Sequence, residues 1–296
     1  MGRIRIRGVP RDQGDSRIRT GGGRVKTTKL SETVGVRVED VDLDRLRSDD
    51  DLPQECLNAL EEHGVLLFPR LHADDETQAA FCRKLGELVQ FPLYPNPDVM
   101  EISFDPDNPN VEYFASNDYW HLDGFMDEVP AKASIMSAHV VTETGGETAF
   151  ASTYVAYDEL SEKEKRRFEG LRVWHSFEAI QRLTYADPTP EQLDEWARRG
   201  GREHPLVWTH ESGRRSLVFG ASADHVVGMA PDEGRALLDD LLARATAPDR
   251  VLCHRWTVGD MVIWDNTGLV HRACPFDRSQ PRRMHRSTLV GQESIK

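Results

Sequence analysis

Five stretches of the chain repeat apolar residues every three or four positions, a spacing that places them on one face of an α-helix. The predicted helices span residues 52–63, 77–88, 154–171, 191–199 and 232–244. Two helix starts carry candidate N-caps, whose side chains accept hydrogen bonds from the first free amides. These caps are Asp74 or Asp75 for the second helix and Ser152 or Thr153 for the third.

Short apolar or alternating runs bounded by turn residues predict β-strands, and they dominate the second half of the chain. The predicted strands span residues 34–38, 65–68, 100–104, 133–141, 206–209, 216–219, 251–256, 261–264, 269–272 and 280–289. Asp265-Asn266 reads as a turn between the eighth and ninth runs, which predicts a hairpin there. The whole pattern predicts an α+β fold.

Length and composition favour one folded domain. The chain has 296 residues, 39% of them hydrophobic, and no Pro/Gly/Ser-rich linker or repeat divides it. The first 26 residues differ, since they hold eight basic and only two acidic residues. We predict a flexible basic arm over 1–26, or alternatively an interaction arm or lid, and one domain over 27–296.

Charge and cysteine usage narrow the partners and the compartment. A formal net charge of −13 disfavours nucleic acid, whose phosphates require a basic face. Cys56, Cys82, Cys253 and Cys274 have no metal-binding spacing and indicate reduced thiols in the cytoplasm. The sequence shows no secretory signal and no apolar stretch long enough to span a membrane, so we expect neither a signal peptide nor a transmembrane helix.

The most informative chemistry is His121-Leu122-Asp123, followed far downstream by His271. Two imidazoles and one carboxylate occupy one face of an octahedral Fe(II) and leave three positions open for reactants. A second such triplet, His72-Ala73-Asp74, precedes the helix predicted over 77–88, so helix capping accounts for it. Taken alone, His139, His175 and His285 are interpreted as ordinary core or surface residues.

Arg282 and Arg286 lie four positions apart in the last predicted strand. Even spacing puts both side chains on the same face of an extended strand. If that face points inward, two guanidiniums enter a pocket, and each can clamp a carboxylate through two hydrogen bonds.

Several motifs in order resemble those of the Fe(II)/2-oxoglutarate-dependent dioxygenases of the taurine and 2,4-dichlorophenoxyacetate type. The resemblance runs from about Thr27 to Gly291, and the motifs that carry it are Trp120-His121-x-Asp123, Gly145-Gly146-Glu147-Thr148, Trp264-Asp265-Asn266, His271 and Arg282 to Arg286. The intervals of 25 residues from Asp123 to Thr148 and 11 from His271 to Arg282 are also family-like.

The resemblance implies roles for these residues. His121, Asp123 and His271 would bind Fe(II), while Arg282 and Thr148 would hold the distal carboxylate of the co-substrate 2-oxoglutarate. Arg286 would grip an anionic substrate, and Asn117, Tyr94 and Phe91 would line its pocket. Two positions depart from the taurine-specific pattern: Phe91 lies where those members have a His, and Ala223 lies where an aromatic residue is expected. Both departures argue against taurine as the substrate.

The implied fold is a double-stranded β-helix, a cupin-like jelly roll, with flanking helices and lid insertions at 105–118 and 178–203. The implied reaction uses O2 to hydroxylate, desaturate or cleave a small anionic substrate, with release of succinate and CO2. Because related halogenases lack the carboxylate, Asp123 favours hydroxylation. The alternatives are a catalytically altered 2-oxoglutarate or metal sensor, a cupin-type metal-dependent hydrolase, or a structural zinc site. A homo-oligomer is compatible with the family.

Overall fold

The computed structural model describes residues 25–296, so the proposed basic arm lies outside the described residues except for Val25 and Lys26. Its largest sheet has seven strands in the order β1-β2-β3-β13-β5-β15-β4. Their bounds are Thr27–Lys29, Val36–Val38, Val65–Phe68, Met261–Asp265, Ala133–Val140, Arg283–Leu289 and Met100–Ser103. A three-stranded sheet, β12-β6-β14, comprises Val251–His254, Thr148–Ser152 and Leu269–Ala273.

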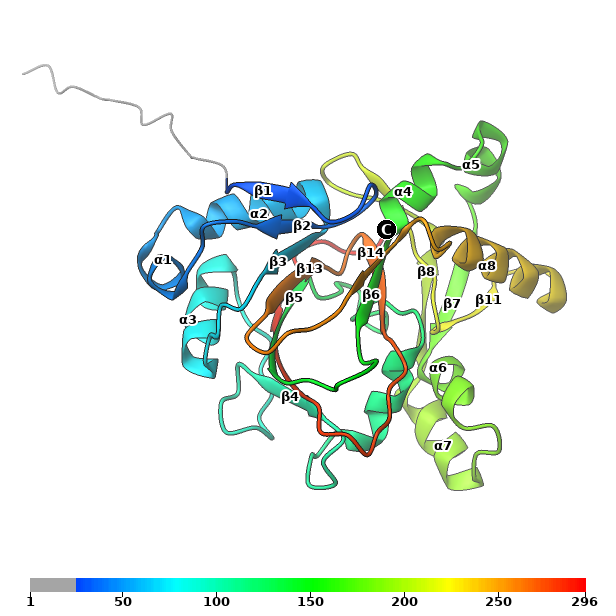
Figure 1. The fold of residues 1–296 in the computed structure, drawn as a ribbon. Coiled ribbons are helices and arrows are strands. Elements are labelled where there is room, and N and C mark those ends of the chain that lie inside the picture. Colours follow the sequence, from blue (N-terminus) through cyan, green and yellow to red (C-terminus); the bar gives the residue numbers. More distant parts are fainter. Residues whose placement is uncertain (1–24) are drawn as a thin grey trace, which may run out of the picture.

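Alternation along the strands shows how the large sheet is covered. In β3, Leu66 and Phe68 pack with the helices, while Val65 and Leu67 belong to a second core that also contains Phe150 of β6. The large sheet is therefore buried on both faces, which explains why its central strands read as continuous apolar runs. Figure 1 shows the helices on one side of this sheet and β6 with β14 on the other.

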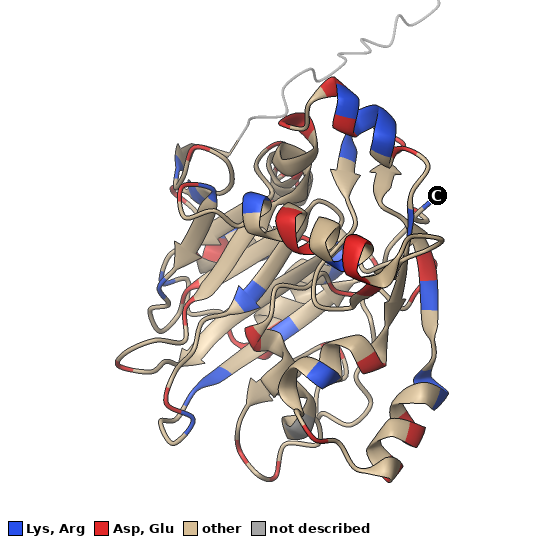
Figure 2. Ribbon diagram, turned by 90° about the vertical axis from the view of Figure 1, so that its right-hand side faces the viewer, with Lys and Arg blue, Asp and Glu red and all other residues tan. Residues whose placement is uncertain are grey.

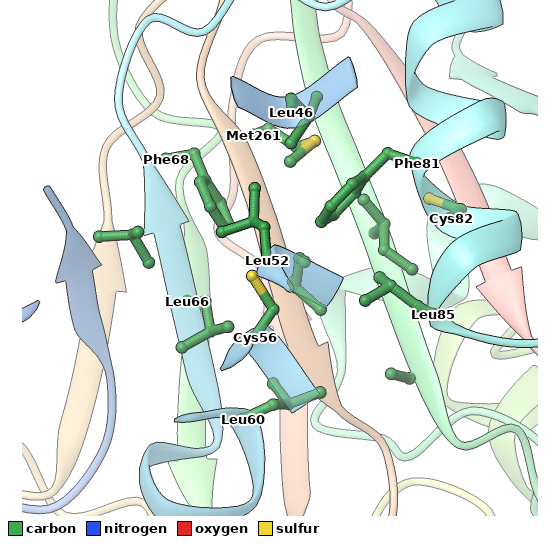
Figure 3. Packing of buried hydrophobic residues seen from close by; sticks show 14 of the residues in the cluster. Leu46, Leu52, Cys56, Leu60, Leu66, Phe68, Phe81, Cys82, Leu85 and Met261 are labelled. Atoms are coloured by element: carbon green, nitrogen blue, oxygen red, sulfur yellow. The ribbon is translucent and has the colours of Figure 1, made fainter. Parts of the chain in front are cut away.

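Three helices, α1 (Leu43–Ser48), α2 (Leu52–His63) and α3 (Asp75–Leu85), cover the outer face of the large sheet. Figure 3 shows their side chains interleaved with those of the strands, with Leu52 and Cys56 close to Leu66 and Phe68. Asp74 caps α3 by accepting from the Thr77 amide, as predicted. The helix ends at Leu85 rather than residue 88, because Gly86 is extended and Leu88 instead bridges to Leu289.

The remaining elements form a third layer with its own core. They comprise β7 (Arg172–Ser176), β8 (Gly201–Pro205), β9 (Val207–Thr209), β10 (Arg215–Leu217) and β11 (Ala223–Val226), with α4 (Thr153–Asp158), α5 (Glu162–Phe168) and α8 (Pro231–Ala245). The insertions hold η1 (Val111–Asp118), α6 (Phe177–Thr184) and α7 (Pro190–Arg199). In Figure 2 acidic and basic residues are interspersed, and α5 has an acidic first turn and a basic last turn. This order of charges interacts favourably with the helix dipole and so stabilises α5.

Two further predictions about local structure are wrong. The helix predicted over 154–171 is two helices, because Ser161 starts α5 with a capping box to Glu164. Strands β13 and β14 are not a hairpin: β13 pairs with β3 and β5, and β14 pairs with β6. Several elements were not predicted at all, namely β1, β6, β7, β8, β11, α1 and α6. No helix of the described residues is long and apolar enough to cross a membrane.

Candidate active site

The structure brings His121, Asp123 and His271 together although 150 residues separate the two histidines. His271 lies on β14, and the His121 segment pairs with it through two backbone hydrogen bonds of 3.0 and 2.8 Å. The Nε2 atoms of His121 and His271 lie 4.0 and 3.9 Å from the Asp123 carboxylate oxygens. One ligand atom from each residue lies within 4.8 Å of the others.

These side chains fit a metal ion. Their ligand atoms face a common space and stand too far apart to hydrogen-bond to one another. His121 Nδ1 contacts the Tyr119 carbonyl at 2.7 Å, and since a carbonyl only accepts, Nδ1 carries the proton and Nε2 keeps its lone pair. Burial lowers the pKa of His121 and lowers that of His271 to about 3, so both imidazoles are neutral at pH 7.

The Asp123 carboxylate is held in its charged form. Burial alone would raise its pKa, but Arg286 and then the two histidines lower it below the ordinary value. Arg286 Nη1 lies 3.4 and 3.5 Å from the two carboxylate oxygens. Ser134 of β5 donates to Asp123 Oδ2 at 3.0 Å, and Asn266 in turn donates to Ser134 Oγ at 3.0 Å. This chain from Asn266 was not anticipated, because only the register of β5 against β13 creates it.

Arg286 projects from the inner face of the large sheet, and Arg282 stands four positions earlier, just before β15. Between them lies Met284, which is fully buried in the core between the sheets. Arg282 itself is 9% exposed, and its Nε and Nη2 donate to the Gly146 carbonyl at 3.3 and 3.1 Å. Burial, and then the neighbouring Arg278, lowers its pKa to about 10, which leaves the guanidinium charged at pH 7.

Thr148 begins β6 two residues after Gly146, and its hydroxyl accepts from the Trp256 indole at 2.9 Å. Its side chain is buried. Gly146 has a positive φ of 73°, and a Cβ there would lie 3.2 Å from Arg282 Nε. The Gly146 carbonyl therefore positions the Arg282 guanidinium.

A cavity of about 360 Å³ opens beside His121 and Asp123. Of the predicted pocket residues, Phe91, Asn117 and Arg286 line it together with His121 and Asp123. Apolar side chains that sequence reasoning did not assign complete the wall: Met100, Ile102, Phe114, Phe177 and Ile180. Two larger hollows, of about 440 and 480 Å³, border α2 instead, so ligand chemistry rather than cavity size selects this site.

Several residues that the sequence singled out do not line that cavity. Arg282 borders a separate hollow of about 320 Å³ beside Arg278. Tyr94 stands behind the wall, where its hydroxyl accepts from Asn110 at 2.9 Å. Ala223 is buried in the core of the third layer.

The insertions containing η1 and α6 both contribute to the cavity wall, and they contact each other. Tyr113 of η1 and Phe177 of α6 meet edge to face with ring centroids 6.0 Å apart. The Arg199 guanidinium of α7 lies 4.3 Å from the Phe177 ring and donates to the Tyr113 hydroxyl at 2.6 Å. The two predicted lid segments therefore form one packed unit over the cavity.

A buried pair of neutral imidazoles and a carboxylate beside an open cavity is the ligand set of non-haem Fe(II) oxygenases. The comparisons with known proteins agree with this class. The chain belongs to the TauD/TfdA family, since the family model described as "Taurine catabolism dioxygenase TauD, TfdA family" matches residues 26–288.

Relatives and solved structures resemble most of the chain. The (S)-phenoxypropionate/alpha-ketoglutarate-dioxygenase of Sphingobium herbicidovorans is 35% identical over 240 residues, 78% of this chain and 83% of the relative. The alpha-ketoglutarate-dependent sulfate ester dioxygenase of Pseudomonas putida is 32% identical over 244 residues, 80% of each chain. The crystal structure of AAD-2 in complex with Mn(II) and N-oxalylglycine has a TM-score of 0.78 and 31% identity, covering 92% of this chain and 99% of the other.

Proposed function

We propose that this protein is a non-haem Fe(II)- and 2-oxoglutarate-dependent oxygenase that hydroxylates a small organic anion. The observation that carries the proposal is the convergence of His121, Asp123 and His271 beside a cavity that also presents Arg286. When bound, Fe(II) and 2-oxoglutarate supply the oxidation: substrate C–H, 2-oxoglutarate and O2 yield substrate C–OH, succinate and CO2.

The roles of the metal ligands follow from their environments. His121 and His271 would bind through Nε2 as neutral imidazoles, and Asp123 would bind as a carboxylate. Asp123 would therefore both bind the metal and pair with Arg286, whose guanidinium lies 3.4 Å from the carboxylate. Ser134 would keep the carboxylate oriented toward the histidines rather than swung onto that cation.

Arg282 and Thr148 are our candidates for holding 2-oxoglutarate. Arg282 is a buried cation whose hydrogen bonds to protein within the described residues go to one carbonyl, which leaves Nη1 free to donate to a carboxylate. The low dielectric around it strengthens such a contact. Thr148 lies two residues beyond that carbonyl and offers a hydroxyl.

The cavity wall supports a substrate with an anionic end and an apolar body. Arg286 provides the positive charge, while Phe91, Phe114, Phe177 and Ile180 provide apolar surface. The named relatives act on a phenoxypropionate and on sulfate esters, which are organic anions with different head groups. We propose that this chain also takes a carboxylate or sulfate attached to a hydrophobic body, and that the packed lid segments exclude water around it.

The remaining parts of the proposal concern architecture and setting. We infer that the large sheet and β12-β6-β14 are the two halves of a double-stranded β-helix with the metal site at its mouth. We further propose one catalytic domain over 27–296, action in the cytoplasm and, as in many enzymes, assembly into a homo-oligomer.

The deciding experiment is an anaerobic absorption titration of metal-free protein with Fe(II) and then 2-oxoglutarate. A charge-transfer band that requires both additions is expected; it is absent in His121→Ala and weakened in Arg282→Ala. Succinate release with (S)-phenoxypropionate or alkyl sulfates then identifies the substrate. If folded, metal-loaded protein gives no band, the oxygenase proposal fails and the hydrolase becomes the better reading. A band without succinate release for any organic anion tested would favour the sensor.

A further inference from the structure

A second group of metal-ligating side chains lies on the opposite face of the large sheet from the active site. It combines Asp75 at the start of α3, His139 of β5 and His285 of β15, and Glu101 of β4 lies beside it. His285 directly precedes Arg286, and because side chains alternate along a strand, the two point to opposite faces. The group is therefore separate from the triad.

Strand register assembles this group. His285 lies directly opposite Ser137 on β5 and Glu101 on β4, in one row across three strands. His139 is skipped in the pairing, since Met284 pairs with Ala138 and Arg283 with Val140. Such a bulge redirects a side chain locally, and here His139 stacks on His285.

One ligand atom from each of Asp75, His139 and His285 lies within 4.8 Å of the others. The two imidazole rings stack with centroids 3.8 Å apart. Asp75 Oδ1 hydrogen-bonds to His285 Nδ1 and lies 3.9 Å from His139 Nε2. On its other edge, His285 Nε2 lies 3.7 Å from Glu101 Oε2 and is buried without a hydrogen-bond partner among the described residues.

The charges that face this group favour a cation. Asp75 and Glu101 carry two negative charges, and Arg283 is the positive group whose field reaches His139. The polar neighbours are neutral: Ser137 contacts His139 Nε2 at 3.1 Å, Ser103 donates to Glu101 Oε1 at 2.7 Å, and Gln78 donates to Ser287 and to the His285 carbonyl. Two closely stacked imidazoles cannot both be protonated cheaply, whereas one divalent ion can engage both.

We propose that Asp75, His139 and His285 form a second metal site for a late first-row divalent ion of the Zn(II) type, with Glu101 adding negative charge on the opposite edge of His285. Imidazole nitrogens and carboxylate oxygens are ligands that Zn(II) accepts in four-coordinate sites. The side chains are 15–38% exposed, so an ion reaches them from solvent without opening the fold. A bound ion joins the start of α3 to β5 and β15, and β15 carries Arg286 on its other face.

Zinc binding to full-length, tag-free protein tests the proposal. Metal-free protein is dialysed against Zn(II) and the bound metal is measured in a His121→Ala background, which disables the first site. This background is expected to retain one ion per chain, and adding His139→Ala or His285→Ala is expected to abolish it. His225→Ala is the matched control, because His225 pairs with Asp224 at 2.9 Å on the surface and belongs to no metal-ligating group among residues 25–296.

A second readout separates a specific site from weak surface binding. Zn(II) is expected to raise the melting temperature of His121→Ala but not of His121→Ala with His139→Ala, because an ion that binds only the folded state stabilises it. If His121→Ala binds no zinc while folded, or if His139→Ala leaves both readouts unchanged, the proposal is wrong. It does not rest on the proposed oxygenase activity, since the first site is disabled throughout.

Discussion

Ser134→Ala tests whether the Asp123 carboxylate needs its serine to act as a metal ligand. Ser134 Oγ donates to Asp123 Oδ2 at 3.0 Å, whereas the Arg286 contacts of 3.4 and 3.5 Å are long for hydrogen bonds. Ser134 is fully buried, so solvent does not replace the lost donor. The variant also leaves the Asn266 amide without the oxygen that accepts its hydrogen bond.

A hydrogen bond to a charged group contributes about 1.5–3 kcal/mol. Since about 1.4 kcal/mol corresponds to a tenfold change in an equilibrium constant, loss of this bond predicts a roughly tenfold to 150-fold weaker affinity for Fe(II). The range agrees with the roughly 10–100-fold effect typical of residues that orient metal ligands. Asn266→Ala affects Asp123 only through Ser134, so we expect it to weaken Fe(II) binding by a smaller factor.

Anaerobic Fe(II) titration can follow tryptophan fluorescence, because the Trp264 ring lies 5.0 Å from that of His271. Ser287→Ala is the control: this serine is equally buried but contacts Gln78 on the outer face of β15. The reasoning is refuted if Ser134→Ala binds Fe(II) as tightly as the wild type, or if Ser287→Ala weakens binding equally.

Three further predictions concern other residues. Arg282→Ala should weaken 2-oxoglutarate binding by more than about tenfold, since a charge-assisted pair is lost, with partial rescue of succinate release at high 2-oxoglutarate; unchanged affinity would contradict the assignment. Gly146→Ala should destabilise the protein by about 1–2 kcal/mol through its φ of 73° and also weaken 2-oxoglutarate but not Fe(II) binding, which titration of both ligands would check. Burial raises the pKa of Asp265 to about 6 in the folded protein from an ordinary 3.8, so its protonated form contributes stability below pH 4 that is lost as the pH rises through 6. Asp265→Asn should therefore raise the free energy of unfolding relative to the wild type by more at pH 8 than at pH 4. The expected difference between the two pH values is up to about 3 kcal/mol. Urea denaturation that gives the same change at both pH values would refute this.

Local patterns in the sequence were sufficient for much of the secondary structure. The helix over Leu52–His63 and the strand over Val65–Phe68 have the predicted bounds, because apolar periodicity and turn residues are local properties. The His-x-Asp motif, the later His271 and the even spacing of Arg282 and Arg286 were likewise visible. Strand β6 was missed because Thr148–Ser152 has one bulky apolar residue among small and polar ones, so neither alternation nor a strong apolar run reveals it.

What the sequence determined by itself was the chemistry available: the residue types, their spacing and the faces on which neighbouring residues lie. The tertiary structure decided which distant residues meet. His121 pairs with His271, Ser134 reaches Asp123, and a bulge stacks His139 on His285, where sequence reasoning saw two ordinary histidines. These contacts depend on strand register across separate sheets, and register follows from the packing of the whole core rather than from any local pattern.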